Sequence, residues 1–254
     1  MLAMQQFGTD TAKPPILIVH GLFGSGRNWG AIAKHLAETR RTVTVDLRNH
    51  GTSFRAQSQS YPEMAADLDM VIGEIGGVAD VIGHSMGGKA AMVLALTRPA
   101  RVRRLLVADI APVPYSHGTS HHNLIAAMKR LDLAQVHTRG EADRALAAEI
   151  DSPSVRAFLL QSLDVKQKRW RLNLDVLDHE LPTILDFPQI DASFAGPTLF
   201  LAGGLSDYIR PEHRAAIKAL FPNAQQARLP GTGHWLHADK PRDFEATARA
   251  FFGG

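Results

Sequence analysis

The sequence predicts an α/β protein with a mostly parallel central sheet, helices on both faces and an inserted helical cap. Short, unbroken apolar runs alternate with helical stretches, which is typical of a parallel sheet that is covered on both sides. The strand pattern stops between residues 112 and 190, where only helical patterns occur. At 254 residues, the chain is long enough for one large domain that carries such an insertion.

The expected elements follow one another in a regular order. Strands are expected at residues 16–20, 42–46, 78–82, 105–109, 198–202 and 226–229. Helices are expected at residues 29–36, 61–75, 88–97, 211–220 and 241–252, and in the insertion at 124–133, 141–150, 154–163 and 174–181. Residues 1–111 and 191–254 are therefore assigned to the sheet domain, and residues 112–190 to a cap. A cap over the carboxyl ends of the strands would wall a binding site and select substrates.

Composition excludes several classes of protein. The formal charge is only +3 and the basic residues are scattered, so no nucleic-acid partner is expected. The chain has no cysteine, which excludes disulfides, thiol nucleophiles and thiolate metal sites. No secretory signal pattern and no apolar run of membrane-spanning length is visible, so we expect a cytoplasmic protein without a membrane partner.

The pentapeptide at residues 83–87, Gly-His-Ser-Met-Gly, fits the pattern Gly-x-Ser-x-Gly. A β-branched run precedes it and an Ala- and Leu-rich helical stretch follows it, which is the context that a nucleophile turn between a strand and a helix requires. Small residues on both sides permit the tight turn, and the helix N-terminus favours developing negative charge. The pattern therefore predicts Ser85 as a nucleophile.

A serine nucleophile needs a base and an acid that orients the base. His234 lies in a glycine-bracketed loop after the last expected strand and is the candidate base, whereas His237 is interpreted as a loop or surface residue. Two candidates exist for the acid. Asp109 ends the strand that follows the nucleophile helix, and Asp207 follows the penultimate strand. Both preserve the chain order Ser, Asp, His and both belong at the carboxyl edge of the sheet, so the residues leave both open.

An oxyanion hole requires two backbone N–H groups that point to the developing negative charge. One is expected from Met86, directly after the nucleophile. The other is expected from the Gly-rich loop at residues 20–26, from Leu22 or alternatively from Phe23. That loop lacks the spacing of a phosphate-binding loop. The polar residues Asp46, Arg48, Asn49 and His50 are expected to brace neighbouring loops.

Histidines also gather near residue 120, which raises the question of a metal site. His117, His121 and His122 lack the spacing and the acidic partners of a ligand set. We therefore expect no metal and no cofactor.

These blocks together resemble the α/β-hydrolase family over nearly the whole chain. The matching segments are residues 20–24 (His-Gly-Leu-Phe-Gly), 46–53, 83–88, 109–112 (Asp-Ile-Ala-Pro) and 233–235 (Gly-His-Trp). They are most similar to small bacterial esterases with thioesterase activity that are related to mitochondrial abhydrolase-domain proteins. That subfamily resemblance implies Asp109 as the acid, whereas the general α/β-hydrolase topology implies Asp207. We favour Asp109.

The resulting hypothesis is a serine carboxylesterase that hydrolyses short- to medium-chain acyl esters through an acyl-enzyme on Ser85. The expected partner is a small-molecule ester or thioester. An acyl-CoA thioesterase with the same three catalytic residues is the alternative. A ligand receptor on a hydrolase scaffold, with slow turnover, is the alternative from another class. Steady-state hydrolysis separates the receptor from the enzymes.

Overall fold

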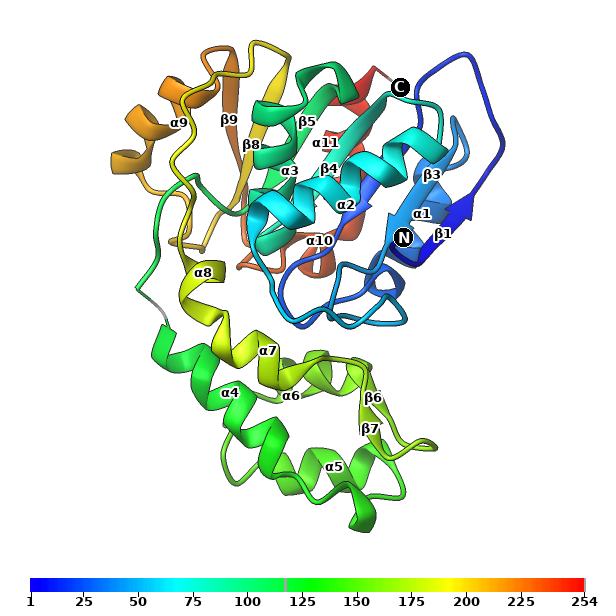
Figure 1. The fold of residues 1–254 in the computed structure, drawn as a ribbon, viewed down its shortest axis with the longest axis vertical. Coiled ribbons are helices and arrows are strands. Elements are labelled where there is room, and N and C mark those ends of the chain that lie inside the picture. The colour runs from blue at the N-terminus through cyan, green and yellow to red at the C-terminus, as the bar shows by residue number, and fades with distance from the viewer. Residues whose placement is uncertain (117, 254) are drawn as a thin grey trace.

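A computed structural model describes residues 1–116 and 118–253 and contains a seven-stranded sheet (Figure 1). Its strands are β1 (Met4–Phe7), β2 (Ile16–Val19), β3 (Thr42–Val45), β4 (Ala79–His84), β5 (Val102–Ala108), β8 (Thr198–Gly203) and β9 (Ala224–Leu229). They lie in the order β1-β3-β2-β4-β5-β8-β9, and all neighbours are parallel except β1, which pairs antiparallel with β3. The predicted mostly parallel α/β fold is confirmed.

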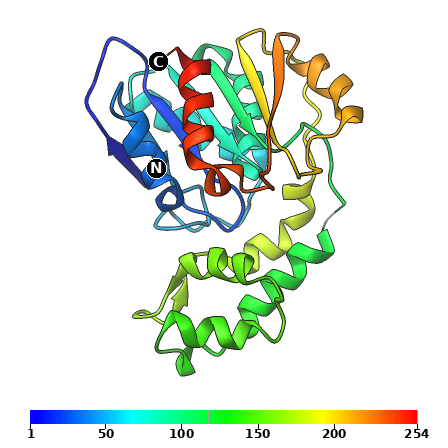
Figure 2. The same ribbon diagram turned by 180° about the vertical axis from the view of Figure 1, so that it is seen from behind.

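Helices cover both faces of this sheet (Figures 1 and 2). The α-helices of the sheet domain are α1 (Gly30–Leu36), α2 (Tyr61–Glu74), α3 (Met86–Thr97), α9 (Arg214–Leu220), α10 (Leu236–Asp239) and α11 (Pro241–Phe252), and its 3-10 helices are η1 (Gly26–Trp29), η2 (Pro99–Arg101) and η5 (Pro211–His213). Side chains of α2, α3 and α9 share one apolar core, and those of α1 and α11 share the core on the opposite face. Helix α3 is buried from Met86 to Leu96 because it packs directly on the central strands.

The segment between β5 and β8 forms a separate layer at the carboxyl ends of the parallel strands (Figure 1). It contains α4 (Gly118–Arg130), α5 (Arg139–Leu146), α6 (Pro153–Leu159), α7 (Leu174–His179) and α8 (Leu181–Leu185), with the 3-10 helices η3 (Leu133–Gln135) and η4 (Leu160–Ser162). A two-stranded hairpin, β6 (Leu163–Asp164) and β7 (Arg169–Trp170), also lies here. The expectation of an insertion without strands is therefore wrong in this detail. We infer from this arrangement that residues 112–190 act as the cap.

The end of the cap, where the chain returns to the sheet domain, is held by contacts with α3, the helix that follows Ser85. The buried Lys89 ammonium on α3 donates to the carbonyls of Leu185, at 2.8 Å, and Asp186, at 2.7 Å. The Tyr61 hydroxyl donates to the carbonyl of Ile184, in the same turn of α8. Burial lowers the pKa of Lys89 to about 7. These contacts connect α8 firmly to α2 and α3.

Strand β1 is the second element that the sequence pattern does not predict. Its residues Met4–Phe7 are mostly exposed, so no unbroken apolar run marks them, and the strand exists because it pairs with the edge of β3.

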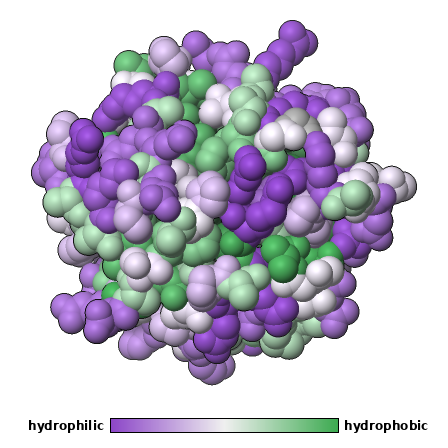
Figure 3. Space-filling view, turned by 90° about the horizontal axis from the view of Figure 1, so that it is seen from above, coloured by the Kyte–Doolittle hydropathy of each residue, from purple (hydrophilic) through white to green (hydrophobic). Residues whose placement is uncertain are grey.

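Figure 3 shows the face of the sheet domain opposite the cap, where hydrophilic residues surround smaller apolar groups. Within the described residues, none of the helices combines the length and the apolar character that crossing a bilayer requires.

Candidate active site

Ser85 lies in a strained turn between β4 and α3. Its φ is +51° and its ψ is −122°, a conformation that non-glycine residues rarely adopt. The flanking glycines are needed because the chain crosses itself closely here. A Cβ on Gly83 would lie 2.6 Å from the Gly87 carbonyl oxygen, and a Cβ on Gly87 would lie 2.3 Å from that of His20. The turn places the Ser85 side chain at the carboxyl edge of the sheet and the Met86 N–H at the N-terminus of α3.

Asp109 and His234 form the polar pair beside Ser85. His234 Nδ1 lies 2.8 Å from Asp109 Oδ2, and the Asp109 side chain is fully buried. Two further donors hold the carboxylate: the Gly203 N–H donates to Oδ1 at 2.9 Å, and the Ser206 hydroxyl donates to Oδ2. An imidazole that donates its Nδ1–H to a carboxylate keeps its Nε2 lone pair available as a base.

The structure places Asp207 differently. Its side chain is 63% exposed, and its Oδ2 accepts a hydrogen bond from the Arg210 guanidinium at 2.9 Å. Of the two aspartates that the sequence left open, the structure brings only Asp109 to His234. A solvent-exposed carboxylate beside an arginine is a surface ion pair, which contributes little to stability or to orientation.

Sequence reasoning missed the side chains that hold His234 in place. The His84 Nε2–H donates to the His234 carbonyl at 2.9 Å, and the Tyr208 ring stacks on the imidazole with its centroid 3.9 Å away. Burial lowers the pKa of His84 well below its usual value, so this ring is neutral. The assignment of His237 to the surface is wrong, because it is buried and stacks on Trp29 at 4.0 Å.

The loop after β2, which carries the candidate oxyanion donors, is held by hydrogen bonds from neighbouring segments. Phe23 has a φ of +64°, and its N–H donates to His50 Nε2 at 3.3 Å. Its carbonyl accepts from the Ser162 hydroxyl of the cap at 2.9 Å. His50 is a fixed acceptor, because its Nδ1–H donates to the Arg48 carbonyl at 2.9 Å and burial lowers its pKa to about 3. Bracing by His50, which the sequence predicted, therefore acts directly on this loop.

These contacts distinguish the candidate oxyanion donors that are available to a substrate from the one that is not. The N–H of Phe23 is engaged by His50, so it is not directed to a substrate. The N–H groups of Leu22 and Met86 make no hydrogen bond to any described residue. Both residues lie beside Ser85, in a small cavity of about 30 Å³. Two backbone donors without a protein acceptor beside a candidate nucleophile are what an oxyanion hole requires.

Replacing His50 by phenylalanine is expected to lower kcat by about 10- to 100-fold, because the Phe23 N–H loses its acceptor and the loop loses its position. KM is expected to change less than kcat, because most of the residues that line the larger cavity beside Ser85 lie outside this loop. His50→Gln is the matched control, because a glutamine oxygen can accept the same hydrogen bond. Steady-state kinetics with one ester measures the effects on kcat and KM separately, and thermal unfolding of each variant measures its stability. A lower unfolding temperature of His50→Phe with an unchanged kcat would contradict the role of His50 in positioning the Phe23 loop.

A mostly apolar cavity of about 420 Å³ lies between Ser85, His234 and the cap. Its cap wall contains Leu124, Ile150 and Phe158, and its volume is within the range of about 300–1,000 Å³ that is typical of small-molecule sites. No hydrogen bond joins the Ser85 hydroxyl to His234 among the described residues. Such bonds are often loose in ligand-free enzymes and tighten when the substrate binds.

The histidines near residue 120 have separate environments. His117 lies outside the described residues. His121 lines the apolar cavity, and His122 Nδ1 pairs with Asp178 Oδ1 at 2.8 Å. In the described parts of the chain, no group of three or more histidine or acidic side chains is arranged to hold a metal ion.

Comparison with known proteins places this site in a family. The family model of the α/β-hydrolase fold matches residues 14–241. The chain is 43% identical over 251 residues to the sn-1-specific diacylglycerol lipase ABHD11 of Mus musculus, covering 95% of this chain and 82% of that protein. It is 39% identical to the esterase YbfF of Escherichia coli, covering 89% of this chain and 88% of that protein. A solved marine microorganism esterase superposes with a TM-score of 0.93 at 38% identity, covering 98% of both chains.

The match extends over nearly the whole chain, and the relatives named above are esterases or lipases. The resemblance expected from the motifs is therefore confirmed. This chain belongs to the α/β-hydrolase family and is a carboxylic ester hydrolase.

Proposed function

We propose that this protein hydrolyses short- to medium-chain acyl esters through an acyl-enzyme on Ser85. Ser85 is the nucleophile, His234 the general base and Asp109 the acid that orients the imidazole. The N–H groups of Leu22 and Met86 form the oxyanion hole. The observation that carries the proposal is the 2.8 Å contact between His234 Nδ1 and Asp109 Oδ2 beside the cavity that Ser85 lines.

The reaction follows from these positions. The Ser85 hydroxyl oxygen attacks the acyl carbonyl carbon while His234 Nε2 accepts its proton. The negative charge that forms on the carbonyl oxygen is stabilised by the two N–H groups, and each such donor contributes roughly 3–4 kcal/mol. Collapse of the tetrahedral intermediate expels the alcohol, which takes the proton from His234. Water then attacks the acyl-enzyme while His234 accepts a proton from it, and the carboxylic acid product leaves.

The preference for acyl length follows from the 420 Å³ cavity, which apolar cap side chains close on one side. Apolar walls favour an alkyl chain by burying it, at about 0.8 kcal/mol per methylene. The enclosed volume limits how many methylenes are buried. We therefore expect kcat/KM to rise with chain length and then to fall once the chain exceeds the cavity.

A series of p-nitrophenyl esters from acetyl to palmitoyl tests this proposal, with acyl-CoAs of the same lengths and a diacylglycerol in parallel. A maximum at short to medium p-nitrophenyl esters is expected. Higher kcat/KM with acyl-CoAs would favour the thioesterase alternative, and binding without turnover would favour a ligand receptor. Labelling with a fluorophosphonate and mass spectrometry are expected to locate the adduct on Ser85. A maximum at palmitoyl, or an adduct at another serine, would contradict the proposal.

A further inference from the structure

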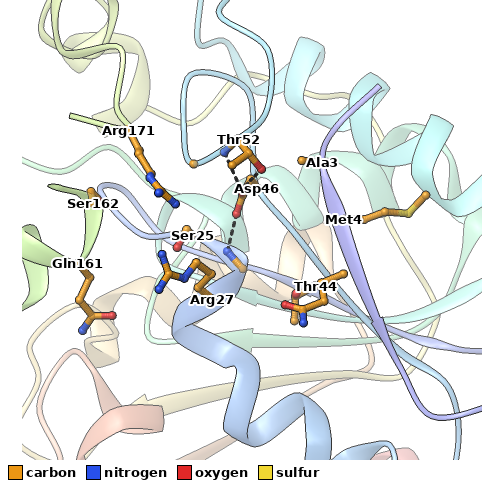
Figure 4. A pocket seen from close by; sticks show the side chains of 13 residues that line it. Ala3, Met4, Ser25, Arg27, Thr44, Asp46, Thr52, Gln161, Ser162 and Arg171 are labelled. Atoms are coloured by element: carbon orange, nitrogen blue, oxygen red, sulfur yellow. Dashed lines mark hydrogen bonds between the residues drawn. The ribbon is translucent and has the colours of Figure 1, made fainter. Parts of the chain in front are cut away.

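A second cavity, of about 120 Å³, lies where the cap meets the sheet domain (Figure 4). Ser25, Arg27 and Thr52 line it from the sheet domain, and Gln161 and Arg171 line it from the cap. It shares no lining residue with the 420 Å³ cavity and is more polar. The reaction proposed for Ser85 uses none of these five side chains.

Two guanidinium groups from different parts of the chain enter this cavity. Figure 4 shows Arg171 and Arg27 with Ser25 between them in this view. Arg27 is exposed, and its side chain makes no hydrogen bond or ion pair with any described residue. Arg171 uses one nitrogen, Nη2, to contact Asp164 Oδ2 at 2.9 Å. Each guanidinium has five N–H donors, so most of them remain available.

The side-chain oxygens of Asp46 and Gln161 in the cavity wall already accept hydrogen bonds. The Asp46 carboxylate accepts from the N–H of Gly26 at 2.8 Å and from the N–H and hydroxyl of Thr52 at 2.8 and 3.1 Å. The side-chain oxygen of Gln161 accepts from the Asn28 amide, which leaves the Gln161 NH₂ as a donor. The cavity therefore has two guanidinium groups and one carboxylate, Asp46, in its lining, and among the described residues Arg27 has no direct ion-pair partner.

We propose that this cavity binds a phosphate-type anion between Arg27 and Arg171. A tetrahedral oxyanion matches the paired donors of guanidinium groups, and arginine is favoured at phosphate sites for this reason. The Gln161 NH₂ lines the cavity from the cap and supplies a further donor, whereas the Ser25 hydroxyl already donates to Asn28 Oδ1 at 3.3 Å. The phosphate is either a free ion or part of the leaving group of a substrate. Only the second case rests on the hydrolysis proposed above.

Such an anion would connect the cap to the oxyanion loop. Gln161 and Arg171 belong to the cap, whereas Arg27 follows the oxyanion loop in the chain. The neighbouring Ser162 lines the same cavity and donates to the Phe23 carbonyl at 2.9 Å. An anion held by both walls is expected to stabilise the contact between the cap and the sheet domain.

Titration of the full-length protein with inorganic phosphate tests the site, with sodium chloride at matched ionic strength as the control. Calorimetry is expected to show saturable binding, and phosphate is expected to raise the unfolding temperature. Arg27→Gln is expected to lose both responses, because it removes the donor without breaking a native contact. Arg171→Gln is expected to weaken them. Arg242→Gln, which removes an exposed arginine elsewhere, and Ser85→Ala are expected to respond like the wild type.

Two thioesters then separate the sources of the phosphate. Butyryl-CoA carries phosphates, whereas butyryl N-acetylcysteamine has the same acyl group and none. If the phosphate belongs to the substrate, Arg27→Gln is expected to lower the ratio of kcat/KM for butyryl-CoA to kcat/KM for butyryl N-acetylcysteamine about tenfold. A loss of this size corresponds to one charge-assisted contact. An unchanged ratio with loss of phosphate binding identifies a free-anion site. An Arg27→Gln variant that binds phosphate like the wild type, or a wild type that binds none at 20 mM, overturns the proposal. A wild type without hydrolytic activity would instead refute the proposed function and leave the binding test intact.

Discussion

Replacing Ser85 by alanine is expected to lower kcat by roughly 10⁶-fold, because the acyl-enzyme can no longer form. The remaining rate over the uncatalysed reaction comes from binding and from the oxyanion donors, which the substitution leaves in place. Alanine tolerates the φ of +51° about as well as serine, so the fold is expected to survive. The measurement is steady-state hydrolysis of p-nitrophenyl butyrate, with thermal unfolding as the check on folding.

Ser154→Ala is the matched control for this variant. Ser154 is an exposed cap residue whose hydroxyl contacts only Ser152 among the described residues. It is expected to keep wild-type activity. Full activity in the Ser85→Ala protein would mean that another group attacks the ester, and the role proposed for the Gly-x-Ser-x-Gly turn would then be abandoned.

Replacing Asp109 by asparagine is expected to lower kcat by about 10⁴-fold at neutral pH. An asparagine amide that donates to His234 Nδ1 favours the tautomer with its proton on Nε2, where the base must be unprotonated. The Gly203 N–H can still donate to the asparagine oxygen in the Oδ1 position. The Ser206 hydroxyl oxygen, which lies beside the former Oδ2, can accept the second N–H of the amide, so the local backbone is expected to hold. Steady-state kinetics over a range of pH values measures the loss, with a fluorophosphonate to compare the reactivity of Ser85.

Asp207→Asn is the internal control for this prediction. It removes an exposed ion pair with Arg210, which contributes at most about 1 kcal/mol to stability, so kcat is expected to stay within about twofold of the wild type. The reverse result, a large loss with Asp207→Asn and little loss with Asp109→Asn, would transfer the orienting role to Asp207.

Much of the fold was predictable because parallel strands buried on both faces leave unbroken apolar runs in the sequence. β2 and β8 are examples, and each is buried at every position. The same reasoning could not detect β1 or the β6–β7 hairpin. Their residues are partly exposed and mixed in character, and their strand conformation comes from pairing with a neighbour.

The histidines show why some of the site could not be predicted. His84 was not singled out from the sequence, and for His50 the polar cluster predicted only that it braces a loop, not which N–H group it accepts from. Burial keeps both rings neutral. The role of each ring is set by its backbone hydrogen bonds: His50 bonds to the Arg48 carbonyl and the Phe23 N–H, and His84 bonds to the His234 carbonyl. The only signal available for His84 was its place next to Ser85. Tyr208 comes near His234 through a loop after β8, a contact that no spacing in the chain indicates.

Local residue types were enough to predict the mostly parallel α/β fold, the turn that carries Ser85 and the loop that carries His234. The sequence could not decide between Asp109 and Asp207, since both follow strands that end at the same edge of the sheet. The tertiary structure decided which of them contacts His234. Asp109 has a φ of +50° and turns its buried carboxylate toward Gly203 and His234, whereas the Asp207 side chain extends into solvent beside Arg210. Side-chain direction and burial arise only from packing, and a motif does not encode them.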